Sequence, residues 1–326
     1  IRPPTSGTPR ETVGSVATRR SSLPNMKVAI IGCGAVGSIH AAKLREGGSA
    51  ELVATYSPNA QKAAAFAAAY GVERVAPSVA DAISKADLAV ICSPSYLHFA
   101  QARECLEAGV QTLVELPPCA TASEAEELAE LARKRGVRLG CAHTSRYLLP
   151  YVWLKENLQR GVLGEIQEVS YLRHHRLRAR SWSDNALLHH AAHSIDLLLY
   201  WCGGLDPKAC IAQPNVAAAQ SVSVLGKLPG GGLATINVSY ASRLPQTRMV
   251  IVGKKHTVET DGFTYLRSDL PQLQFQGDEQ EVYEQAVRDQ DAEFLGACQG
   301  KGTYVSWDET IKLIRTVNQF QALAVH

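Results

Sequence analysis

The segment Gly32-Cys33-Gly34-Ala35-Val36-Gly37 directly follows an apolar run and opens a stretch with helical periodicity. The first glycine of such a segment permits a tight turn, the second lets the backbone approach a pyrophosphate, and the third lets the helix pack closely on the strand. The free N–H groups at the start of the helix then face the phosphates. The pattern predicts a parallel α/β domain with a dinucleotide site formed by Gly32, Gly34, Ala35, Val36 and Gly37.

The rest of the chain predicts two domains. Short apolar runs alternate with helical stretches up to residue 146, which predicts a doubly wound parallel Rossmann sheet at 26–146. From there, longer alternating segments at 217–225, 233–240 and 248–252 are separated by glycine-rich turns, which favours antiparallel strands. We therefore expect an α/β protein whose residues 147–326 form an α+β domain for substrate binding and oligomerisation. Its sheet should be large, open and mostly antiparallel, and the last helix is free to pack back on the Rossmann domain.

Several predicted elements position the motifs discussed below. The first half should have strands at 27–31, 51–56, 88–92, 111–115 and 137–141 and helices at 35–45, 60–69, 99–108 and 123–135. The second half should add helices at 150–160, 187–201, 284–298 and 307–324 and a strand at 166–172.

Composition excludes several classes of protein. The formal charge of the 326 residues is +2, but residues 1–25 hold four arginines and one acid, which leaves about −1 for the remainder. That balance disfavours nucleic-acid or membrane-surface binding, and no apolar run is long enough to span a bilayer. Residues 1–25 are predicted to be a disordered leader or an added arm, with an organelle transit peptide as the alternative. The eight cysteines include no CxxC pair, as expected for thiols in a reducing cytoplasm.

The end of the second predicted strand indicates the cofactor type. An NAD site usually has a carboxylate there, whereas this chain has Tyr56-Ser57-Pro58-Asn59. Ser57 could donate a hydrogen bond to a 2′-phosphate, so NADP is the predicted cofactor and NAD the alternative. Ser93 and Pro94 follow a later strand at the same edge of the sheet and should also contact the cofactor. His98, which opens the next helix, should contact the nicotinamide side or cap that helix.

Three histidines on the predicted helix at 187–201 are the candidate catalytic residues. His189 and His193 are four residues apart and share a face, and His190 is three residues from His193. Imidazole titrates near neutrality, so His193 is our predicted base for a hydroxyl proton. His189 or His190 should polarise the oxygen or orient the substrate, and Asp196 could fix the tautomer of His193.

The same spacing of histidines also occurs in zinc sites. His190, however, stands where an HExxH helix needs its glutamate, and the sequence shows no third acid or cysteine ligand nearby. We therefore expect no metal.

Four stretches together resemble the glucose-fructose oxidoreductase and inositol dehydrogenase superfamily (Gfo/Idh/MocA), over nearly all of residues 26–326. They are the glycine turn, Glu115-Leu116-Pro117, His143-Thr144-Ser145-Arg146-Tyr147 and the string from His189 to Asp196. The resemblance implies an NAD(P)-dependent dehydrogenase acting on CH–OH groups, with Glu115 and Leu116 at the cofactor and His143 at the substrate. Most members have lysine where this chain has Leu116, and aspartate where it has His189. The lysine-assisted mechanism therefore does not carry over.

Both departures, together with Arg180-Ser181-Trp182-Ser183-Asp184, resemble one branch of that family. Enzymes of this branch act in aromatic-acid catabolism and use NADP to oxidise the cyclic hemiacetal of 4-carboxy-2-hydroxymuconate-6-semialdehyde to 2-pyrone-4,6-dicarboxylate. The resemblance implies a small anionic substrate, with Asp184 among the residues that bind it. Guanidinium groups bind carboxylates in pairs of hydrogen bonds, and Arg146 and Arg180 are the predicted partners. Trp182 could lie against a flat ring, or be ordinary core.

Two other interpretations remain open. A run of cationic residues at 173–180 is expected to be mostly a solvated loop or strand edge. The chain could instead be a sugar or cyclohexadiene-diol dehydrogenase, or a non-catalytic dinucleotide-binding regulator that has lost the lysine. A regulator has no need of three neighbouring imidazoles, which favours an enzyme. An open sheet would leave one face uncovered, so a homodimer or homotetramer is expected.

Overall fold

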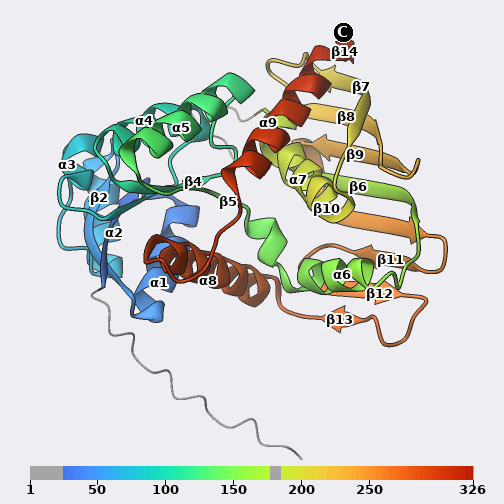
Figure 1. The fold of residues 1–326 in the computed structure, drawn as a ribbon, viewed down its shortest axis with the longest axis horizontal. Coiled ribbons are helices and arrows are strands. Elements are labelled where there is room, and N and C mark those ends of the chain that lie inside the picture. The colour runs from blue at the N-terminus through green and yellow to red at the C-terminus, as the bar shows by residue number, and fades with distance from the viewer. Residues whose placement is uncertain (1–24, 177–184, 326) are drawn as a thin grey trace, which may run out of the picture.

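The computed structural model describes residues 25–176 and 185–325, which form two halves that are each built on one sheet (Figure 1). The first half is a five-stranded parallel sheet in the order β2-β1-β3-β4-β5. The strands are β1 (Met26–Ile31), β2 (Ala50–Tyr56), β3 (Leu88–Ile91), β4 (Gln111–Glu115) and β5 (Leu139–Ala142). Almost every residue of β1 and β3 is buried, as expected for parallel strands covered on both faces.

Helices cover both faces of this sheet. They are α1 (Ala35–Gly47), α2 (Ala60–Tyr70), α3 (Val79–Ile83), η1 (Ser95–Leu97), α4 (His98–Glu107) and α5 (Ala122–Arg135). Several ends follow local sequence signals: Asn59 caps α2, and Thr121 and Glu124 form a reciprocal capping box at α5. The Rossmann sheet predicted from the glycine turn is confirmed.

The second half is a nine-stranded sheet in the order β13-β12-β11-β10-β6-β9-β8-β7-β14. Its strands are β6 (Ile166–Arg176), β7 (Asp206–Gln213), β8 (Ser221–Lys227), β9 (Leu233–Ser239), β10 (Ala241–Gly253), β11 (Thr257–Thr260), β12 (Tyr265–Ser268), β13 (Phe275–Gln276) and β14 (Ala324–Val325). Two pairs, β6–β9 and β7–β14, are parallel, and the others are antiparallel. The predicted fold class is therefore confirmed.

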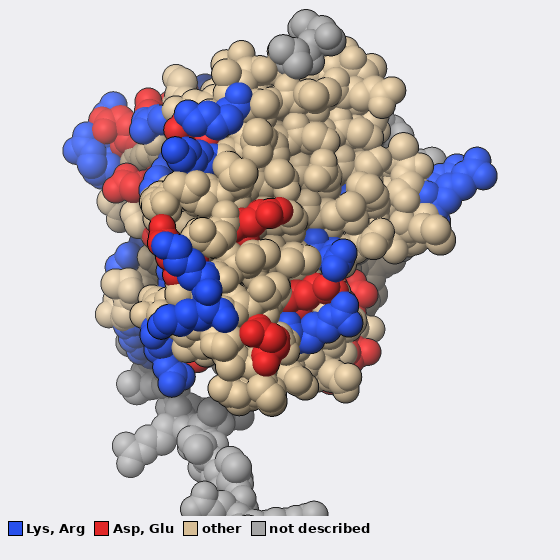
Figure 2. All heavy atoms as spheres, turned by 90° about the vertical axis from the view of Figure 1, so that its right-hand side faces the viewer, with Lys and Arg blue, Asp and Glu red and all other residues tan. Residues whose placement is uncertain are grey.

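Helical segments lie against one face of this sheet. They are η2 (Thr144–Tyr147), α6 (Leu149–Gln159), η3 (Leu187–Ala191) and α7 (Ala192–Cys202) (Figure 1). The opposite face bears alternating side chains of β8 and β9 that point outward, such as Ser223, Leu225 and Asn237. Figure 2, which views the molecule from the right-hand side of Figure 1, shows a broad surface with few charged side chains.

The start of the cationic run at 173–180 lies in an interior strand. β6 continues to Arg176 and pairs with β10 on one side and β9 on the other. The expectation of a solvated loop or strand edge is therefore wrong for residues 173 and 174, which pair with a strand on each side, whereas Arg176 lies beyond the pairing with β9 and is exposed. Residues 177–184 lie outside the described parts of the chain.

The predicted helix at 187–201 is not a continuous α-helix. Its first turn, η3, has π-helical hydrogen bonding, and the α-helix proper, α7, begins at Ala192. A π-turn contains an extra residue, so the angular positions of side chains on its two sides differ from those of a regular helix. The assumption of a simple four-residue spacing between His189 and His193 therefore does not hold.

The last two long helices return to the first half. α8 (Glu279–Cys298) packs on α1 and η2, and α9 (Trp307–Ala322) packs on α5 and β5 as well as on α7 and β7 (Figure 1). C-terminal residues therefore reach the region beside the glycine turn. None of the helices in the described ranges is long and apolar enough to cross a membrane.

Candidate functional site

The glycine turn is shaped as its sequence predicts. Gly32 has φ +110°, and a Cβ there would lie 2.5 Å from the backbone carbonyl carbon of Cys92. A Cβ at Gly37 would collide with the carbonyl oxygen of Gly32. A Cβ at Gly34 would instead meet no described atom within 4 Å, and no side chain caps the helix there. This open approach to the amide groups at the start of α1 suits a dinucleotide pyrophosphate.

Other predicted cofactor residues lie at the carboxyl edge of the parallel sheet. Ser57 follows β2 and is partly exposed, and its Oγ accepts a hydrogen bond from the Asn59 backbone at 3.3 Å. Ser93 and Pro94 follow β3 and are also partly exposed. The region therefore offers hydroxyl groups and no carboxylate directly after β2.

His98 has a structural role that was not expected. The residue is buried, with Nδ1 2.8 Å from the Pro117 carbonyl oxygen and Nε2 2.7 Å from the Ser93 carbonyl oxygen. Its side chain makes no hydrogen bond that caps α4. His98 therefore joins the loops that follow β3 and β4, and both ring nitrogens are already occupied by backbone oxygens.

Glu115 lies at the end of β4, in a chain of buried polar groups. Its Oε1 is 2.8 Å from His40 Nε2, while His40 Nδ1 is 2.7 Å from Asp291 Oδ2. Burial disfavours a charge on His40, but Asp291 and Glu115 outweigh it and raise the pKa of His40 to about 10. The protonated imidazole therefore holds together α1, β4 and α8. Glu115 keeps a partly exposed edge toward the cofactor region.

Leu116 was expected at the cofactor but lies in the core. The side chain is 3% exposed and belongs to the apolar cluster that also contains Leu148, Ala191 and Ala192. A leucine at this position therefore contributes packing between the two halves.

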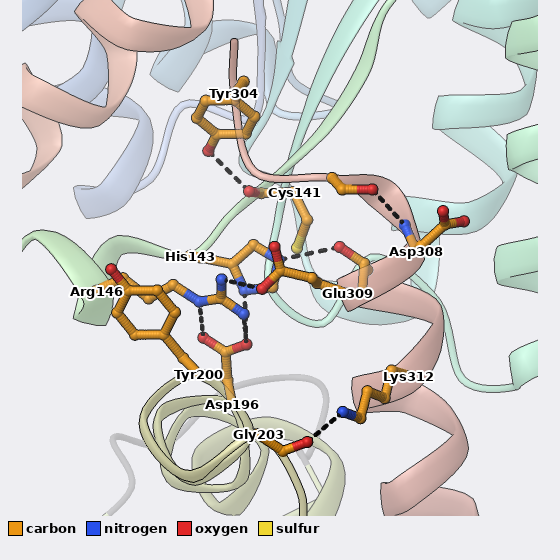
Figure 3. A network of polar contacts seen from close by, with 12 residues as sticks. Cys141, His143, Arg146, Asp196, Tyr200, Gly203, Tyr304, Asp308, Glu309 and Lys312 are labelled. Carbon is orange, nitrogen blue, oxygen red and sulfur yellow. Dashed lines mark hydrogen bonds and ion pairs between the residues drawn. The ribbon is translucent and has the colours of Figure 1, made fainter. Parts of the chain in front are cut away.

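Arg146 and His143 were expected to bind substrate, but both are occupied by protein groups (Figure 3). The Arg146 guanidinium donates to both carboxylate oxygens of Asp196, at 2.9 and 2.7 Å, and to Glu309 at 2.5 Å. It also lies over the Tyr200 ring. His143 places Nδ1 3.0 Å from Asp196 and Nε2 2.9 Å from the Thr310 hydroxyl. These contacts give both side chains a structural role between the two halves, and the structure does not support the expectation that they bind substrate.

Asp196 belongs to the same network. Burial opposes its ionisation, but His143 and Arg146 outweigh that effect and hold the pKa of Asp196 below its ordinary value. The carboxylate is thus committed to Arg146 and His143, and the suggestion that it fixes the tautomer of His193 is not supported.

Histidines of η3, α7 and β6 come together in what we call the histidine cluster. It consists of His175, His189, His190 and His193. The rings of His175 and His190 stack with centroids 4.4 Å apart, and His193 lies 6.2 Å from His189 and 6.4 Å from His190. The Tyr240 hydroxyl is 3.2 Å from His189 Nδ1. The π-turn therefore brings all three predicted catalytic histidines into one group.

The surroundings keep two members of this cluster, His190 and His193, uncharged. Burial, followed by the charge of Arg173, lowers the pKa of His190 well below its ordinary value. Burial and the neighbouring His189 lower the pKa of His193 to about 3. Both imidazoles are therefore neutral near pH 7, so each keeps one ring nitrogen without a proton, and the lowered pKa also makes each a weaker base than a free imidazole. Among the described residues, His190 Nδ1 is buried without a hydrogen-bond partner.

Sequence reasoning missed residues of β6, of the link between β9 and β10, and of α8 that lie in this region. Arg173 and His175 were included in a run expected to be mostly solvated, while Tyr240 and Tyr283 were not considered. Burial and then Glu115 raise the pKa of Tyr283, whereas Arg173 acts in the opposite direction, so Tyr283 lies within electrostatic reach of both. The alternation along β6 could have identified Arg173 and His175, since both share the parity of the buried Val169 and Tyr171.

Three further candidates cannot be placed. Arg180, Trp182 and Asp184 lie outside the described residues, as do residues 1–24 of the predicted leader. Within the described ranges, no group of three or more His, Cys, Asp or Glu side chains is arranged to hold a metal ion.

Comparison with known proteins agrees with this arrangement. The chain is 28% identical over 228 residues to 4-carboxy-2-hydroxymuconate-6-semialdehyde dehydrogenase of Sphingobium sp., covering 66% of this chain and 72% of that protein. Its fold matches UDP-N-acetylglucosamine 3-dehydrogenase from Acidithiobacillus ferrooxidans with a TM-score of 0.77, at 23% identity over 93% of this chain and 98% of that one. It also matches GenD2 of gentamicin A biosynthesis, solved with NAD, with a TM-score of 0.81 at 19% identity over 97% of each chain.

Family models cover most of the molecule. An oxidoreductase family with an NAD-binding Rossmann fold matches residues 26–143, and the GFO/IDH/MocA C-terminal domain matches residues 151–259. The expected NAD(P)-dependent dehydrogenase is thereby confirmed at the level of the enzyme class. The chain belongs to the GFO/IDH/MocA family of oxidoreductases.

Proposed function

We propose that this enzyme is an NADP-dependent dehydrogenase that oxidises a cyclic hemiacetal of an anionic product of aromatic ring cleavage. The cyclic form of 4-carboxy-2-hydroxymuconate-6-semialdehyde is our leading substrate, with 2-pyrone-4,6-dicarboxylate as the product. The observation that carries the proposal is the histidine cluster, in which His190 and His193 are neutral, in a chain that has Leu116 where most members of this family have a lysine. The similarity to the Sphingobium dehydrogenase supports the choice of substrate.

The glycine turn, Ser57, Ser93 and Pro94 would hold the cofactor, and NADP is favoured because no carboxylate follows β2. When bound, its nicotinamide ring supplies the acceptor for a hydride from the substrate carbon. Glu115, fixed by His40 and Asp291, lies at the end of β4 on the same edge of the sheet. Its role would be to orient the groups bound there.

His193 acts in this proposal as the base. Its neutral imidazole takes the proton of the hemiacetal hydroxyl while hydride leaves the same carbon, so the C–H and O–H bonds are replaced by a carbonyl. His190, whose Nδ1 lacks a partner among the described residues, would hydrogen-bond to the reacting oxygen. His189, held by the Tyr240 hydroxyl, would keep the cluster in place.

The direct test is optical. Purified protein is mixed with the ring-cleavage semialdehyde and either NADP⁺ or NAD⁺, and nicotinamide reduction is followed by absorbance. Rapid reduction with a preference for NADP⁺ is the expected result. Reduction with a neutral sugar or a cyclohexadiene diol, and none with the semialdehyde, would replace the proposed substrate. Cofactor binding without reduction of either cofactor by any of these substrates would favour a regulator.

We also propose that the enzyme is a homodimer or homotetramer that assembles through the outer face of the nine-stranded sheet. The part of that face formed by β7, β8 and β9 includes exposed Ile211, Leu225 and Leu233, and Figure 2 shows a surface whose upper part has few charged side chains. Sedimentation at micromolar concentration should show an oligomer that Leu225→Glu weakens. A monomeric wild-type protein would overturn this proposal.

A cytoplasmic location completes the proposed function. All eight cysteines are free thiols in the structure, and burial raises the pKa of every one of them above its ordinary value. Thiols of this kind suit a reducing compartment. Fractionation of the native host, with detection of the protein in the cytosolic fraction, tests this assignment.

A further inference from the structure

We propose that Arg173 binds a carboxylate of the substrate beside the histidine cluster, so that the enzyme selects anionic hydroxy compounds over neutral ones. The inference rests on the proposed dehydrogenase function and names the residue that would give it a preference for an anionic substrate. Sequence reasoning assigned that task to Arg146 and Arg180. Arg146 is unavailable because Asp196 and Glu309 bind it.

The first argument is the position of Arg173 on the sheet. Along β6, Val169 and Tyr171 are buried, at 1% and 5% exposure, on the face that carries the helices. Side chains two residues apart on a strand point to the same face, so Arg173 and His175 also point toward the helices. In register, Arg173 lies beside Val238 of β9, which is itself buried.

The second argument is what surrounds this side chain. The next inward residue, His175, stacks on His190 with ring centroids 4.4 Å apart. The charge of Arg173 lowers the pKa of His190, His193 and Tyr283. Its guanidinium therefore lies within electrostatic reach of all three side chains. The guanidinium is therefore next to the base proposed above and within electrostatic reach of the Glu115 side of the cofactor region.

The third argument is the lack of an anion for this cation. Of the ion pairs formed between described residues, none includes Arg173, although the side chain is partly buried. Other arginines of the same sheet, Arg248 and Arg267, are paired with Glu259. Glu115 and Asp196, the carboxylates near the site, are committed to His40 and Arg146. A partly desolvated cation in this position favours an anion from outside the chain.

The chemistry of the guanidinium defines the ligand. Its planar fork binds a carboxylate through two parallel hydrogen bonds, which fixes the orientation of a flat molecule as well as its charge. The neutral imidazoles of His190 and His193 do not repel or attract the anion strongly. A neutral sugar offers no group that satisfies this cation, so it should bind poorly in comparison.

The test measures binding rather than turnover. Pyridine-2,4-dicarboxylate and the neutral pyridine-2,4-dicarboxamide are titrated by calorimetry into the full chain loaded with NADP⁺. Wild-type protein should bind the dicarboxylate and discriminate against the diamide. Arg173→Gln should weaken dicarboxylate binding by about 10- to 100-fold, the range of a charge-assisted hydrogen-bonded pair, and leave the diamide unaffected.

Two variants complete the design. Arg176→Gln removes the same charge from the same strand, but its exposed side chain has the opposite parity, so dicarboxylate binding should stay within about twofold of wild type. Arg173→Lys keeps the positive charge but loses the planar guanidinium, so it should bind the dicarboxylate with intermediate affinity. If Arg173→Gln does not fold, this variant tests whether Arg173 binds the carboxylate.

Equal dicarboxylate binding by wild type and Arg173→Gln overturns the inference, as does wild-type protein that fails to bind the dicarboxylate. If Arg173 controls dicarboxylate binding but the semialdehyde is not oxidised, the anion site stands and the proposed substrate fails. If the semialdehyde is oxidised equally well by wild type and Arg173→Gln, the proposed function stands and the anion site fails.

Discussion

Two groups of histidines in this protein have opposite electrostatic surroundings. His40 lies between Asp291 and Glu115, which raise its pKa to about 10 in spite of burial. His193 lies beside other imidazoles and Arg173, and burial with these neighbours lowers its pKa to about 3. The difference shows that carboxylates turn a buried histidine into a charged structural link, while their absence leaves it neutral and able to take a proton.

The largest expected effect is the loss of turnover when neutral His193 is replaced. His193→Asn should lower kcat by about 10²- to 10⁴-fold, the usual contribution of a general base, with cofactor affinity nearly unchanged. Initial rates and a fluorescence titration with NADPH measure the two quantities. His174→Asn is the matched control, because His174 lies next to His175 in β6 but its side chain is on the opposite, outer face of the sheet. Unchanged turnover in His193→Asn would remove our assigned base.

A second prediction concerns the network in Figure 3. Asp196→Asn should lower the free energy of unfolding by about 3–5 kcal/mol, because it leaves the buried Arg146 guanidinium without its main partner. Urea unfolding followed by circular dichroism measures this. Asp206→Asn, an exposed carboxylate paired with Lys208, should change stability little. A stable Asp196→Asn protein with altered substrate affinity would instead indicate that Asp196 contributes to substrate binding.

Protonated His40 should make the free energy of unfolding depend on pH. The pKa of His40 is above its ordinary value of 6.5 when folded, so its contribution is fully present below pH 6.5 and lost as the pH rises through about 10. The difference in unfolding free energy between wild type and His40→Asn should fall by a few kcal/mol, as an order of magnitude, over that interval. Parallel stability curves for the two proteins would mean that His40 is not charged.

The smallest expected effect concerns catalysis at acid pH. Because the pKa of His193 is about 3, its imidazole is neutral well below pH 6.5. We therefore expect kcat/KM to change by less than about threefold between pH 5.5 and 8, without the acid limb of an ordinary histidine. A limb with a midpoint near pH 6.5 would show that the base is not held in this environment.

Local sequence signals predicted the elements and the cofactor turn, because glycines at fixed spacing and short apolar runs have the same meaning in any parallel sheet. They did not predict the partners of polar residues far apart in the chain. Asp196 is 50 residues from Arg146, and Asp291 is 251 residues from His40. Arg146 therefore looked like a substrate ligand when it is a structural one. Arg173 was missed for another reason: the strand was predicted to end at residue 172, so the alternation that buries Val169 and Tyr171 was not extended to Arg173.

The contact between His40 and Asp291 also has a consequence for the order in which the chain is made. At about 5–20 residues per second, the ribosome needs roughly 10–50 s to add the residues that separate these two side chains. During that time α1 is already synthesised but its imidazole has no Asp291 to bind. The packing of α1 against α8 therefore forms only after α8 leaves the ribosome, which makes this part of the N-terminal half a post-translational or very late co-translational contact.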